Sequence, residues 1–267
     1  MMQNWLQLEN KVIIVTGGEA GIGKAIVDKL AGLSAKVASV DINAKNNTDE
    51  DGIFHVQCDV SKKESVDNMV QSVVEHYGKI DALINNAGVA RPQLFIDAKG
   101  KNPKYEADTD SLDFIFNINV KGVFLCSQAV AKQFLKQKSK GTIVNMSSES
   151  SMEGSAGQSI YAASKNAVNS FTRSWAKELG CYGIRVVAMA PGILEETSMR
   201  SPAYNEALAY TRNTTVDNLT PDYAKSIPLG RPGYLEEIAD MAAYLASDRS
   251  SYVTGTVFNI TGGKSRG

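Results

Sequence analysis

A tyrosine and a lysine four residues apart, Tyr161 and Lys165, are the side chains best suited to move a proton. On a helix of 3.6 residues per turn, this spacing puts the phenol and the ammonium on one face, one turn apart. Lowering a tyrosine pKa from about 10 by roughly three units stabilises the phenolate by about 4 kcal/mol. An ammonium about 4 Å away, at an effective dielectric constant of about 20, supplies energy of that order. Tyr161 is therefore predicted to be a general acid and base for a hydroxyl or carbonyl. The same spacing occurs by chance on many amphipathic helices, so the rest of the chain must decide.

The composition excludes several other kinds of chemistry. The 267 residues are 43% hydrophobic and 21% charged, as in an ordinary globular protein. A net charge of −1 without a long basic run gives no electrostatic case for nucleic acid or a membrane surface. Three dispersed cysteines and two histidines favour neither a metal site nor a serine–histidine triad. No signal peptide and no run of 18 apolar residues is evident, so a cytoplasmic protein is expected.

A glycine-rich turn follows the first predicted strand, residues 11–16, and leads into a helical pattern. Free backbone amides and the helix dipole favour a pyrophosphate at such a helix start, and glycines let a ligand approach the main chain. A tight turn alone would explain the glycines equally well. The predicted cofactor contacts in this turn are Gly17, Gly21, Ile22 and Gly23.

The second predicted strand, residues 36–41, ends at Asp41, eighteen residues after Gly23. A carboxylate at this distance can accept hydrogen bonds from the adenosine ribose hydroxyls, and it would repel a 2′-phosphate. Glu19 adds a second negative charge in the glycine turn. NAD is therefore the predicted cofactor, although Lys45 is close enough in sequence to keep NADP open.

Further strand-like segments alternate with helix-like stretches along the whole chain. This alternation is typical of a parallel sheet covered on both faces. We therefore predict a single α/β domain over residues 1–267, doubly wound and Rossmann-like, with a seven-stranded parallel sheet. The remaining predicted strands are residues 52–58, 80–85, 141–147, 184–190 and 256–260.

Polar residues follow several of these strands, at the ends that line the ligand crevice of an open parallel sheet. Asp59 and Val60 are predicted to meet the adenine. Asn86, Ala87 and Gly88 follow the fourth strand and are predicted either to brace it and approach the ribose, or only to form a turn.

Three other polar positions complete the set. Asn119 lies in the apolar helical stretch 114–131 and suggests a local kink or a bound water. Ser148 closes the fifth strand, thirteen residues before Tyr161, and Pro191-Gly192 close the sixth.

In its motifs and their spacing, the sequence resembles the short-chain dehydrogenases/reductases over nearly the whole chain. The motifs that carry this resemblance are, in order, TGGEAGIG, NNAG, Asn119, Ser148, YAASK and Pro191-Gly192. The resemblance implies that Tyr161 is the acid/base and that Ser148 hydrogen-bonds the reacting oxygen. It also implies that Lys165 lowers the tyrosine pKa and holds the nicotinamide ribose, while Asn119 anchors a proton-relaying water.

The resemblance extends to the cofactor and the assembly. The family usually has a threonine five residues after the proline, whereas Thr197 lies six after Pro191. The backbone of Ile193 is therefore the firmer expected contact, with Thr197 as a second one. A homotetramer built on the apolar helices 120–135 and 161–179 is implied, and a dimer remains open.

Within this family, VNMSSESSMEGSAGQS, APGILEETSMR and TGGKSRG resemble bacterial dehydrogenases of sugar-alcohol phosphates. This implies conversion of glucitol 6-phosphate to fructose 6-phosphate. A lid is expected around residues 195–227, and a second insertion at 99–110. Another polyol or hydroxy-compound remains an alternative substrate. A non-catalytic dinucleotide sensor is a third possibility, which the intact Ser148, Tyr161 and Lys165 disfavour.

A phosphorylated substrate needs cations, and arginine binds phosphate through two hydrogen bonds. Each candidate side chain is more commonly a solvated surface charge. The candidate cations are Arg91, Lys104, Arg200, Arg212, Lys264 and Arg266, and the candidate acceptors for sugar hydroxyls are Glu149 and Glu153.

Overall fold

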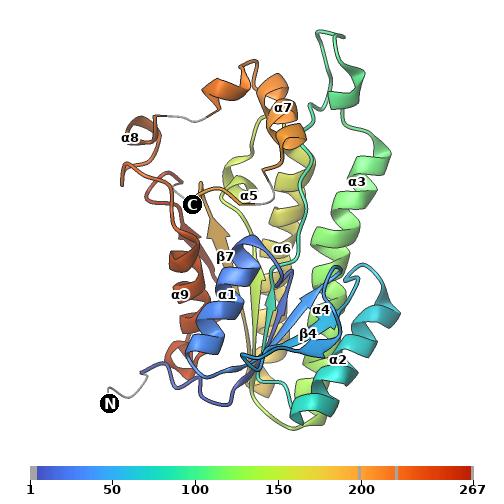
Figure 1. Cartoon of the computed structure of the whole chain (residues 1–267), viewed down its shortest axis with the longest axis vertical. Coiled ribbons are helices and arrows are strands. Elements are labelled where there is room, and N and C mark those ends of the chain that lie inside the picture. Colours follow the sequence, from blue (N-terminus) through green and yellow to red (C-terminus); the bar gives the residue numbers. More distant parts are fainter. Residues whose placement is uncertain (1–4, 198–199, 220–221, 266–267) are drawn as a thin grey trace.

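One β-sheet organises the fold, and its strands run parallel except at one edge (Figure 1). The computed structural model describes residues 5–197, 200–219 and 222–265. Within these residues the strand order is β3-β4-β2-β1-β5-β6-β7-β8. The strands are β1 (Val12–Thr16), β2 (Lys36–Asp41), β3 (Asn47–Thr48), β4 (Phe54–Gln57), β5 (Ala82–Asn85), β6 (Gly141–Met146), β7 (Ile184–Pro191) and β8 (Val257–Ile260).

All seven predicted strands are present and parallel, and the structure adds an eighth, β3. This two-residue strand pairs antiparallel with β4, with Asn47 opposite His55 and Thr48 opposite Phe54. The turn between them is closed by the Asp49 carboxylate, whose Oδ1 accepts hydrogen bonds from the Ile53 amide. The prediction of seven parallel strands is thus confirmed and extended by a short antiparallel edge.

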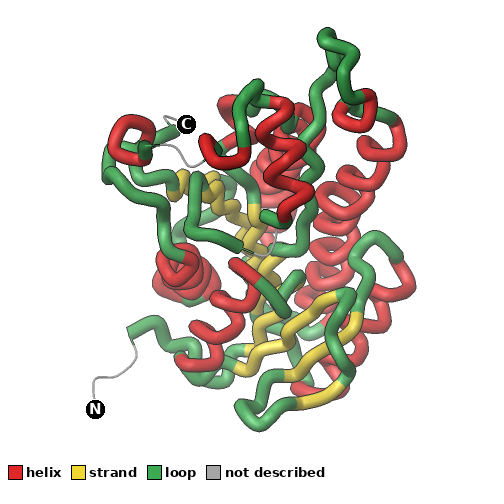
Figure 2. The backbone as a smooth tube through the Cα atoms, turned by 45° about the horizontal axis from the view of Figure 1, so that its top comes forward, coloured by secondary structure: helices red, strands yellow, loops and turns green. Residues whose placement is uncertain are grey.

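Helices cover both faces of the sheet (Figure 2). Helices α1 and α9 pack on one face, and α2, α4 and α6 pack on the other. Alternate strand residues belong to the two cores, because successive side chains of a strand point to opposite faces. The helices are α1 (Gly21–Gly32), α2 (Lys63–Tyr77), α3 (Thr109–Phe116), α4 (Val123–Lys136), α5 (Ser150–Glu153), α6 (Ser159–Leu179), α7 (Pro202–Thr211), α8 (Tyr223–Ser226) and α9 (Leu235–Ala246).

Helices α3 and α4 are joined by a π-helical turn, η2 (Asn117–Gly122), which contains the fully buried Asn119. Such a turn locally widens a helix and frequently occurs at functional sites. The irregularity predicted from Asn119 is therefore present.

By length and composition alone, the helical stretch Thr109–Lys136 is long and apolar enough to cross a membrane. Its apolar window has a mean hydropathy of 1.4, and 44% of that window is buried in the protein. The stretch also supplies Val130 and Phe134 to the hydrophobic core. A core helix satisfies the same criteria, so this finding is weak evidence for a membrane span.

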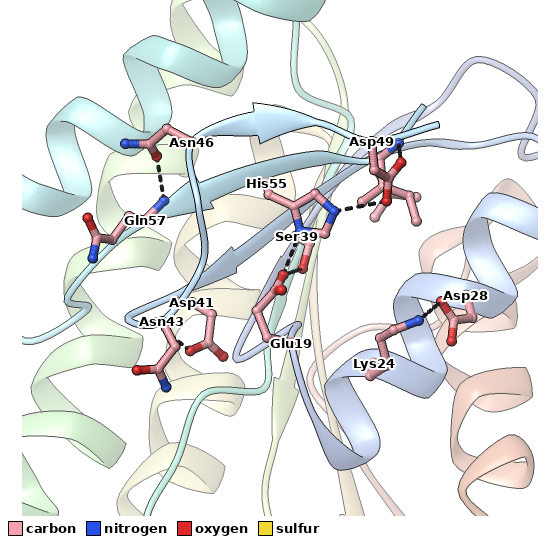
Figure 3. A network of polar contacts seen from close by, with 12 residues as sticks. Glu19, Lys24, Asp28, Ser39, Asp41, Asn43, Asn46, Asp49, His55 and Gln57 are labelled. Atoms are coloured by element: carbon pink, nitrogen blue, oxygen red, sulfur yellow. Dashed lines mark hydrogen bonds and ion pairs between the residues drawn. The ribbon is translucent and has the colours of Figure 1, made fainter. Parts of the chain in front are cut away.

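An ionic cluster links the glycine-rich turn to the sheet edge (Figure 3). His55 on β4 lies between two carboxylates, with Nδ1 2.7 Å from Glu19 Oε1 and Nε2 2.9 Å from Asp49 Oδ2. Ser39 on β2 also donates to Glu19, over 2.6 Å. Only the imidazolium can donate from both ring nitrogens, so the cluster favours protonated His55.

The pKa of His55 follows from these contacts. Burial disfavours the imidazolium, but hydrogen bonds to Asp49 and Glu19 outweigh it and raise the pKa above 6.5. For Asp49, burial works against ionisation, but the hydrogen bonds from His55 and Ile53 prevail and lower its pKa. The stabilising contribution of His55 is therefore complete below its unfolded pKa of about 6.5, and it is lost as pH rises through the higher folded value.

We predict that His55→Gln costs about 1 kcal/mol of stability at pH 6, because it removes a charged hydrogen-bonding partner. The deficit should shrink as pH rises from 6 to 9, since the wild type then loses its imidazolium. Urea unfolding at several pH values measures this change. His76→Gln, which alters the other histidine outside the cluster, is the control. A deficit independent of pH would contradict the charged state of His55.

Candidate active site

A pocket of about 740 Å³ lies at the carboxyl ends of the parallel strands. This is where open α/β sheets bind ligands. Its wall is built from the glycine-rich turn, the ends of β2, β5, β6 and β7, the start of α6 and the segment around α7. It brings together these predicted residues: Gly17, Gly21, Ile22, Asp41, Asn86, Ala87, Gly88, Ser148, Glu149, Glu153, Tyr161, Lys165, Pro191, Gly192, Ile193, Thr197, Arg200, Arg212 and Lys264.

The glycine-rich turn is shaped by close backbone packing. Gly17 and Gly21 have φ angles of +66° and +53°, which favour glycine. A Cβ on Gly23 would lie 1.8 Å from the Gly17 carbonyl oxygen and 2.5 Å from Asn86 Nδ2. Gly23 is therefore behind the pocket wall, where it lets α1 approach the turn.

Asn86 and Thr16 join this turn to the end of β5. Asn86 Nδ2 donates to the carbonyls of Thr16 and Gly17, both over 3.0 Å. Thr16 Oγ1 accepts from the amides of Asn86 and Ala87, both over 3.1 Å. Asn86 thus braces the end of β5, as one of the two predictions for it stated. Its approach to the ribose stays a prediction.

The residues present fit a dinucleotide. Helix α1 has no side-chain cap and no acidic residue in its first turn, so its amides and dipole are open to an anion. Asp41 lies in the same wall, and its Oδ1 accepts from the Asn43 amide over 3.0 Å. A Cβ on Gly21 would lie 3.6 Å from Thr197 Cβ, so Thr197 lies beside the glycine-rich turn.

Glu19, which adds a negative charge to the glycine-rich turn, does not line the pocket. Its carboxylate is turned toward Ser39 and His55 (Figure 3), and it is absent from the pocket wall. Asp41 is the carboxylate of this region that lines the pocket.

Asp59 and Val60 also lie outside the pocket wall. Asp59 Oδ1 accepts from the Ser61 amide and hydroxyl, over 3.0 and 2.6 Å. Val60 packs on Gly122, where a Cβ would lie 2.8 Å from Val60 Cγ2. Their predicted contact with adenine has no direct support from this arrangement.

Tyr161 and Lys165 lie one turn apart near the start of α6. Lys165 is only 3% exposed, its Nζ donates to the Met146 carbonyl over 2.8 Å, and it lies 5.8 Å from the centre of the Tyr161 ring. The side chain of Ser148 lies close enough to the Tyr161 hydroxyl to lower its pKa. The predicted proton donor, its polar partner and the ammonium are therefore assembled at one place.

The pKa values of this pair are set by burial. Burial raises the pKa of Tyr161 to about 12, although the polar side chain of Ser148 opposes the shift. Burial lowers the pKa of Lys165 to about 8. The direction for Tyr161 is opposite to the one expected from the sequence, because Lys165 is directed at the Met146 carbonyl and its own charge is disfavoured by burial. In the protein itself Tyr161 is thus a neutral phenol, which can donate a proton.

Asn119 lies behind the pocket wall and connects it to α6. Its side chain accepts from the Val89 amide over 2.8 Å and donates to the Val89 carbonyl and to Ser164 Oγ, over 2.9 and 3.0 Å. A Cβ on Gly88 would lie 3.2 Å from Lys165 Nζ and 3.3 Å from Asn119 Oδ1. Asn119 is therefore a neighbour of the lysine, while its predicted role with a water stays a prediction.

Three candidate cations lie away from the pocket or outside the described residues. The guanidinium of Arg91 stacks on the Phe114 ring at 3.9 Å, and Lys104 lies 4.6 Å from the centre of the Tyr105 ring. Neither residue lines the pocket, so the prediction that Arg91 contacts substrate is not supported. Arg266 lies outside the described residues.

The segment that includes α7 forms part of the pocket wall. Tyr204 on α7 lines the wall, and the Gln158 side-chain amide donates to its hydroxyl. Burial raises the pKa of Tyr204, whereas the nearby positive charges of Arg200 and Arg212 lower it. Tyr204 is also close enough to Tyr161 to influence its pKa. Both arginines therefore lie at the α7 end of the pocket.

Sequence reasoning missed Met146, Gln158 and Tyr204. Met146 contributes a backbone carbonyl, which any residue type could supply. Tyr204 lies within the predicted lid, where a tyrosine in a helix-like stretch was a usable signal. Among the described residues, no group of three or more His, Cys, Asp or Glu is placed to hold a metal ion.

Comparison with known proteins gives the family. A model of the short chain dehydrogenase family matches residues 11–207. A sorbitol-6-phosphate 2-dehydrogenase of Klebsiella pneumoniae is 52% identical over 268 residues, covering 100% of both chains. A 3-oxoacyl-[acyl-carrier-protein] reductase of Thermotoga maritima is 39% identical and covers 97% of this chain and 99% of its own.

Solved structures agree with this family. A 3-ketoacyl-(acyl-carrier-protein) reductase from Brucella melitensis, complexed with NADH, has a TM-score of 0.80 and 29% identity, and the match covers 97% of this chain and 100% of that one. The ligand-free aldohexose dehydrogenase of Thermoplasma acidophilum has a TM-score of 0.79 and 26% identity, with 96% and 94% covered.

The chain belongs to the short-chain dehydrogenase family. It is accordingly an oxidoreductase that uses a nicotinamide dinucleotide and acts on a small molecule.

We predict that Tyr161→Phe lowers kcat/KM about 10³-fold, because it removes the proton donor while preserving the ring. The dissociation constant for NADH, measured by fluorescence, should stay within about twofold, since the ring and Lys165 remain. Tyr182→Phe, at a tyrosine that is 57% exposed, is the matched control. Retention of more than a tenth of the activity would contradict the assigned role.

Proposed function

We propose that the chain is an NAD-dependent dehydrogenase of sugar-alcohol phosphates that interconverts D-glucitol 6-phosphate and fructose 6-phosphate. The observation that carries this proposal is the pair of arginines at the α7 end of the pocket. Arg200 and Arg212 both influence Tyr204. Among the described residues, neither has a carboxylate partner within salt-bridge distance. Two unpaired guanidinium groups in a pocket wall suit a phosphate ester.

The choice of this substrate is also supported by similarity. The sorbitol-6-phosphate 2-dehydrogenase of Klebsiella pneumoniae matches over its full length at 52% identity, compared with 39% for the reductase of Thermotoga maritima. Glu149 and Glu153 line the pocket near Ser148, where carboxylates can accept hydrogen bonds from sugar hydroxyls. The segment 195–227 includes α7 and α8, supplies the arginine end of the wall and is proposed as the lid.

The reacting hydroxyl or carbonyl lies against Tyr161 and Ser148 in this proposal. In the direction of ketone reduction, the neutral Tyr161 phenol donates its proton to the carbonyl oxygen, and the Ser148 hydroxyl donates a second hydrogen bond to that oxygen. In the direction of alcohol oxidation, Tyr161 must first lose its proton to solvent, and the phenolate then accepts the proton of the substrate hydroxyl as the carbon gives up its hydride. The nicotinamide, when bound, supplies or accepts the hydride.

NAD rather than NADP is proposed as the cofactor because of the charges near the end of β2. Asp41 lines the pocket, whereas Lys45 is exposed and absent from the wall. Asp41 can accept hydrogen bonds from the ribose hydroxyls and would repel a 2′-phosphate. Gly17, Gly21 and Ile22 are proposed to hold the pyrophosphate, and Pro191, Gly192, Ile193 and Thr197 to hold the nicotinamide end.

We also propose a cytoplasmic homotetramer. Phe124 on α4 is 38% exposed, and its ring lies 6.3 Å from both Phe171 and Trp175 on α6. An aromatic cluster shared by these two helices favours burial against another copy. The tetramer and the location stay predictions.

The proposal is tested by initial rates of NADH formation. D-Glucitol 6-phosphate with NAD should be turned over fast, and both plain glucitol and NADP should give at least 10-fold lower kcat/KM. Reduction of acetoacetyl-CoA tests the thioester class suggested by the acyl-carrier relatives. Preference for the thioester, or for plain glucitol or another polyol, would reject the phosphate ester as substrate. A protein that binds NADH but turns over none of these would favour a sensor.

We predict that Arg212→Leu raises the KM for glucitol 6-phosphate about 10- to 100-fold, because one charged hydrogen-bond donor to the phosphate is lost. The kcat/KM for unphosphorylated glucitol should be unchanged. Arg249→Leu, at an exposed arginine in the turn after α9, is the control. An equal loss of kcat/KM with both substrates would show that Arg212 supports the structure of the pocket and does not bind the phosphate.

A further inference from the structure

The segment after β8 carries Lys264 into the pocket wall of its own chain. Gly262 and Gly263 have φ angles of +62° and +89° and pack closely on the segment after α8. A Cβ on Gly262 would lie 2.7 Å from Ile227 Cγ2, and one on Gly263 would lie 3.0 Å from Pro228 Cγ. The Lys264 amide then donates to the Thr261 carbonyl over 3.2 Å. A tightly packed turn therefore fixes the position of the Lys264 backbone, from which the side chain extends to the pocket wall.

Lys264 forms an ion pair with Glu149, the residue after Ser148. Its Nζ lies 2.6 Å from Glu149 Oε1, and the two side chains are 27% and 13% exposed. The amide of Glu149 donates to the Pro191 carbonyl over 3.0 Å, which holds the residue against the end of β7. Glu149 is thus held in place by the hydrogen bond of its backbone amide and by the ion pair at one of its carboxylate oxygens.

The second oxygen of this carboxylate lacks a hydrogen-bond donor. Glu149 Oε2 is buried and has no hydrogen-bond partner among the described residues. A Cβ on Gly192 would lie 2.9 Å from it, so a glycine leaves it room. A buried carboxylate oxygen without a donor is unfavourable, and a rotation of the carboxylate toward the pocket lets a ligand hydroxyl supply that donor.

We propose that Glu149 Oε2 accepts a hydrogen bond from the hydroxyl on the carbon next to the reacting one, and that Lys264 is the positioning residue that holds Glu149 for this contact. The inference rests on the proposed function, in which the substrate is a polyol. It assigns the C-terminal segment to recognition of the C1 hydroxyl within the same chain.

The charges in the pocket wall orient such a substrate. The free oxygen of Glu149 repels a phosphate, and the charge of Lys264 is already paired with this carboxylate. Arg200 and Arg212 are the pocket arginines at the α7 end. A hexitol 6-phosphate therefore binds with its phosphate at the arginines, C1 at Glu149 and C2 at Tyr161. This orientation selects C2 over C5 for oxidation.

The test compares ketones with and without the neighbouring hydroxyl. Fructose 6-phosphate is compared with 1-deoxyfructose 6-phosphate, and hydroxyacetone with acetone, in wild type, Glu149→Gln and Lys264→Met. In wild type, kcat/KM should be about 10- to 100-fold higher for the hydroxylated member of each pair. Both variants should reduce this preference at least 10-fold, mainly through KM, and leave the deoxy substrates within about threefold.

Two further variants separate positioning from folding. Lys264→Arg should restore most of the preference, because it keeps a cation beside Glu149 Oε1. Lys11→Met removes an exposed ion pair with Asp248, 3.0 Å long. This variant should leave kcat/KM unchanged for both substrates of each pair. Thermal unfolding of each variant excludes a general loss of structure.

Two outcomes are distinguishable. An unchanged preference in Lys264→Met, or an equal loss on hydroxy and deoxy substrates, would overturn the role of the pair. Absence of turnover with fructose 6-phosphate would instead reject the proposed function, and the hydroxyacetone and acetone pair would still report on Glu149 and Lys264.

Discussion

The buried ammonium of Lys165 is the constraint around which the site is arranged. It is 3% exposed, and among the described residues no carboxylate lies within salt-bridge distance of it. Its hydrogen bond to the Met146 carbonyl compensates only part of the lost hydration, which is why burial lowers its pKa to about 8. Such a charge is costly to the fold, and proton chemistry at Tyr161 explains why it is kept.

The surroundings of Lys165 follow from this constraint. A side chain at Gly88 would crowd this region, since a Cβ would lie 3.2 Å from the ammonium. Asn119 reaches the same region from a π-helical turn, and it is held there by Val89 and Ser164. The widened turn of η2 and the tight packing at Gly88 both lie beside Lys165. Two local irregularities that are separate in the sequence therefore position the same side chain.

The sequence predicted the parts of this molecule that depend on local patterns. The seven parallel strands were found because buried parallel strands are nearly continuous apolar runs, and the glycine-rich turn and the Tyr161–Lys165 pair were recognised from spacing together with the other motifs of the chain. Strand β3 was missed because two polar residues have no strand pattern, and they pair only where Asp49 closes the turn. Contacts that depend on where a long side chain points were the least predictable. Arg91 stacks on Phe114 and Glu19 turns to His55, although sequence position placed both near ligands.

In our proposal, part of the substrate recognition lies beyond the part of the chain that the family model matches. The family model ends at residue 207, so it includes Glu149 and Arg200 but neither Arg212 nor Lys264. The matched part supplies strands β1 to β7, the glycine-rich turn, Ser148, Tyr161 and Lys165, which are equally suited to a polyol or to an acyl thioester. The proposed selectivity comes from charged residues in the pocket wall. A polyol phosphate has a dianion at one end and a hydroxyl at the other, and the arginines, which have no salt-bridge partner among the described residues, together with the Glu149 carboxylate match that polarity. A thioester carries no hydroxyl next to its reacting carbonyl, so it would leave Glu149 Oε2 without a partner.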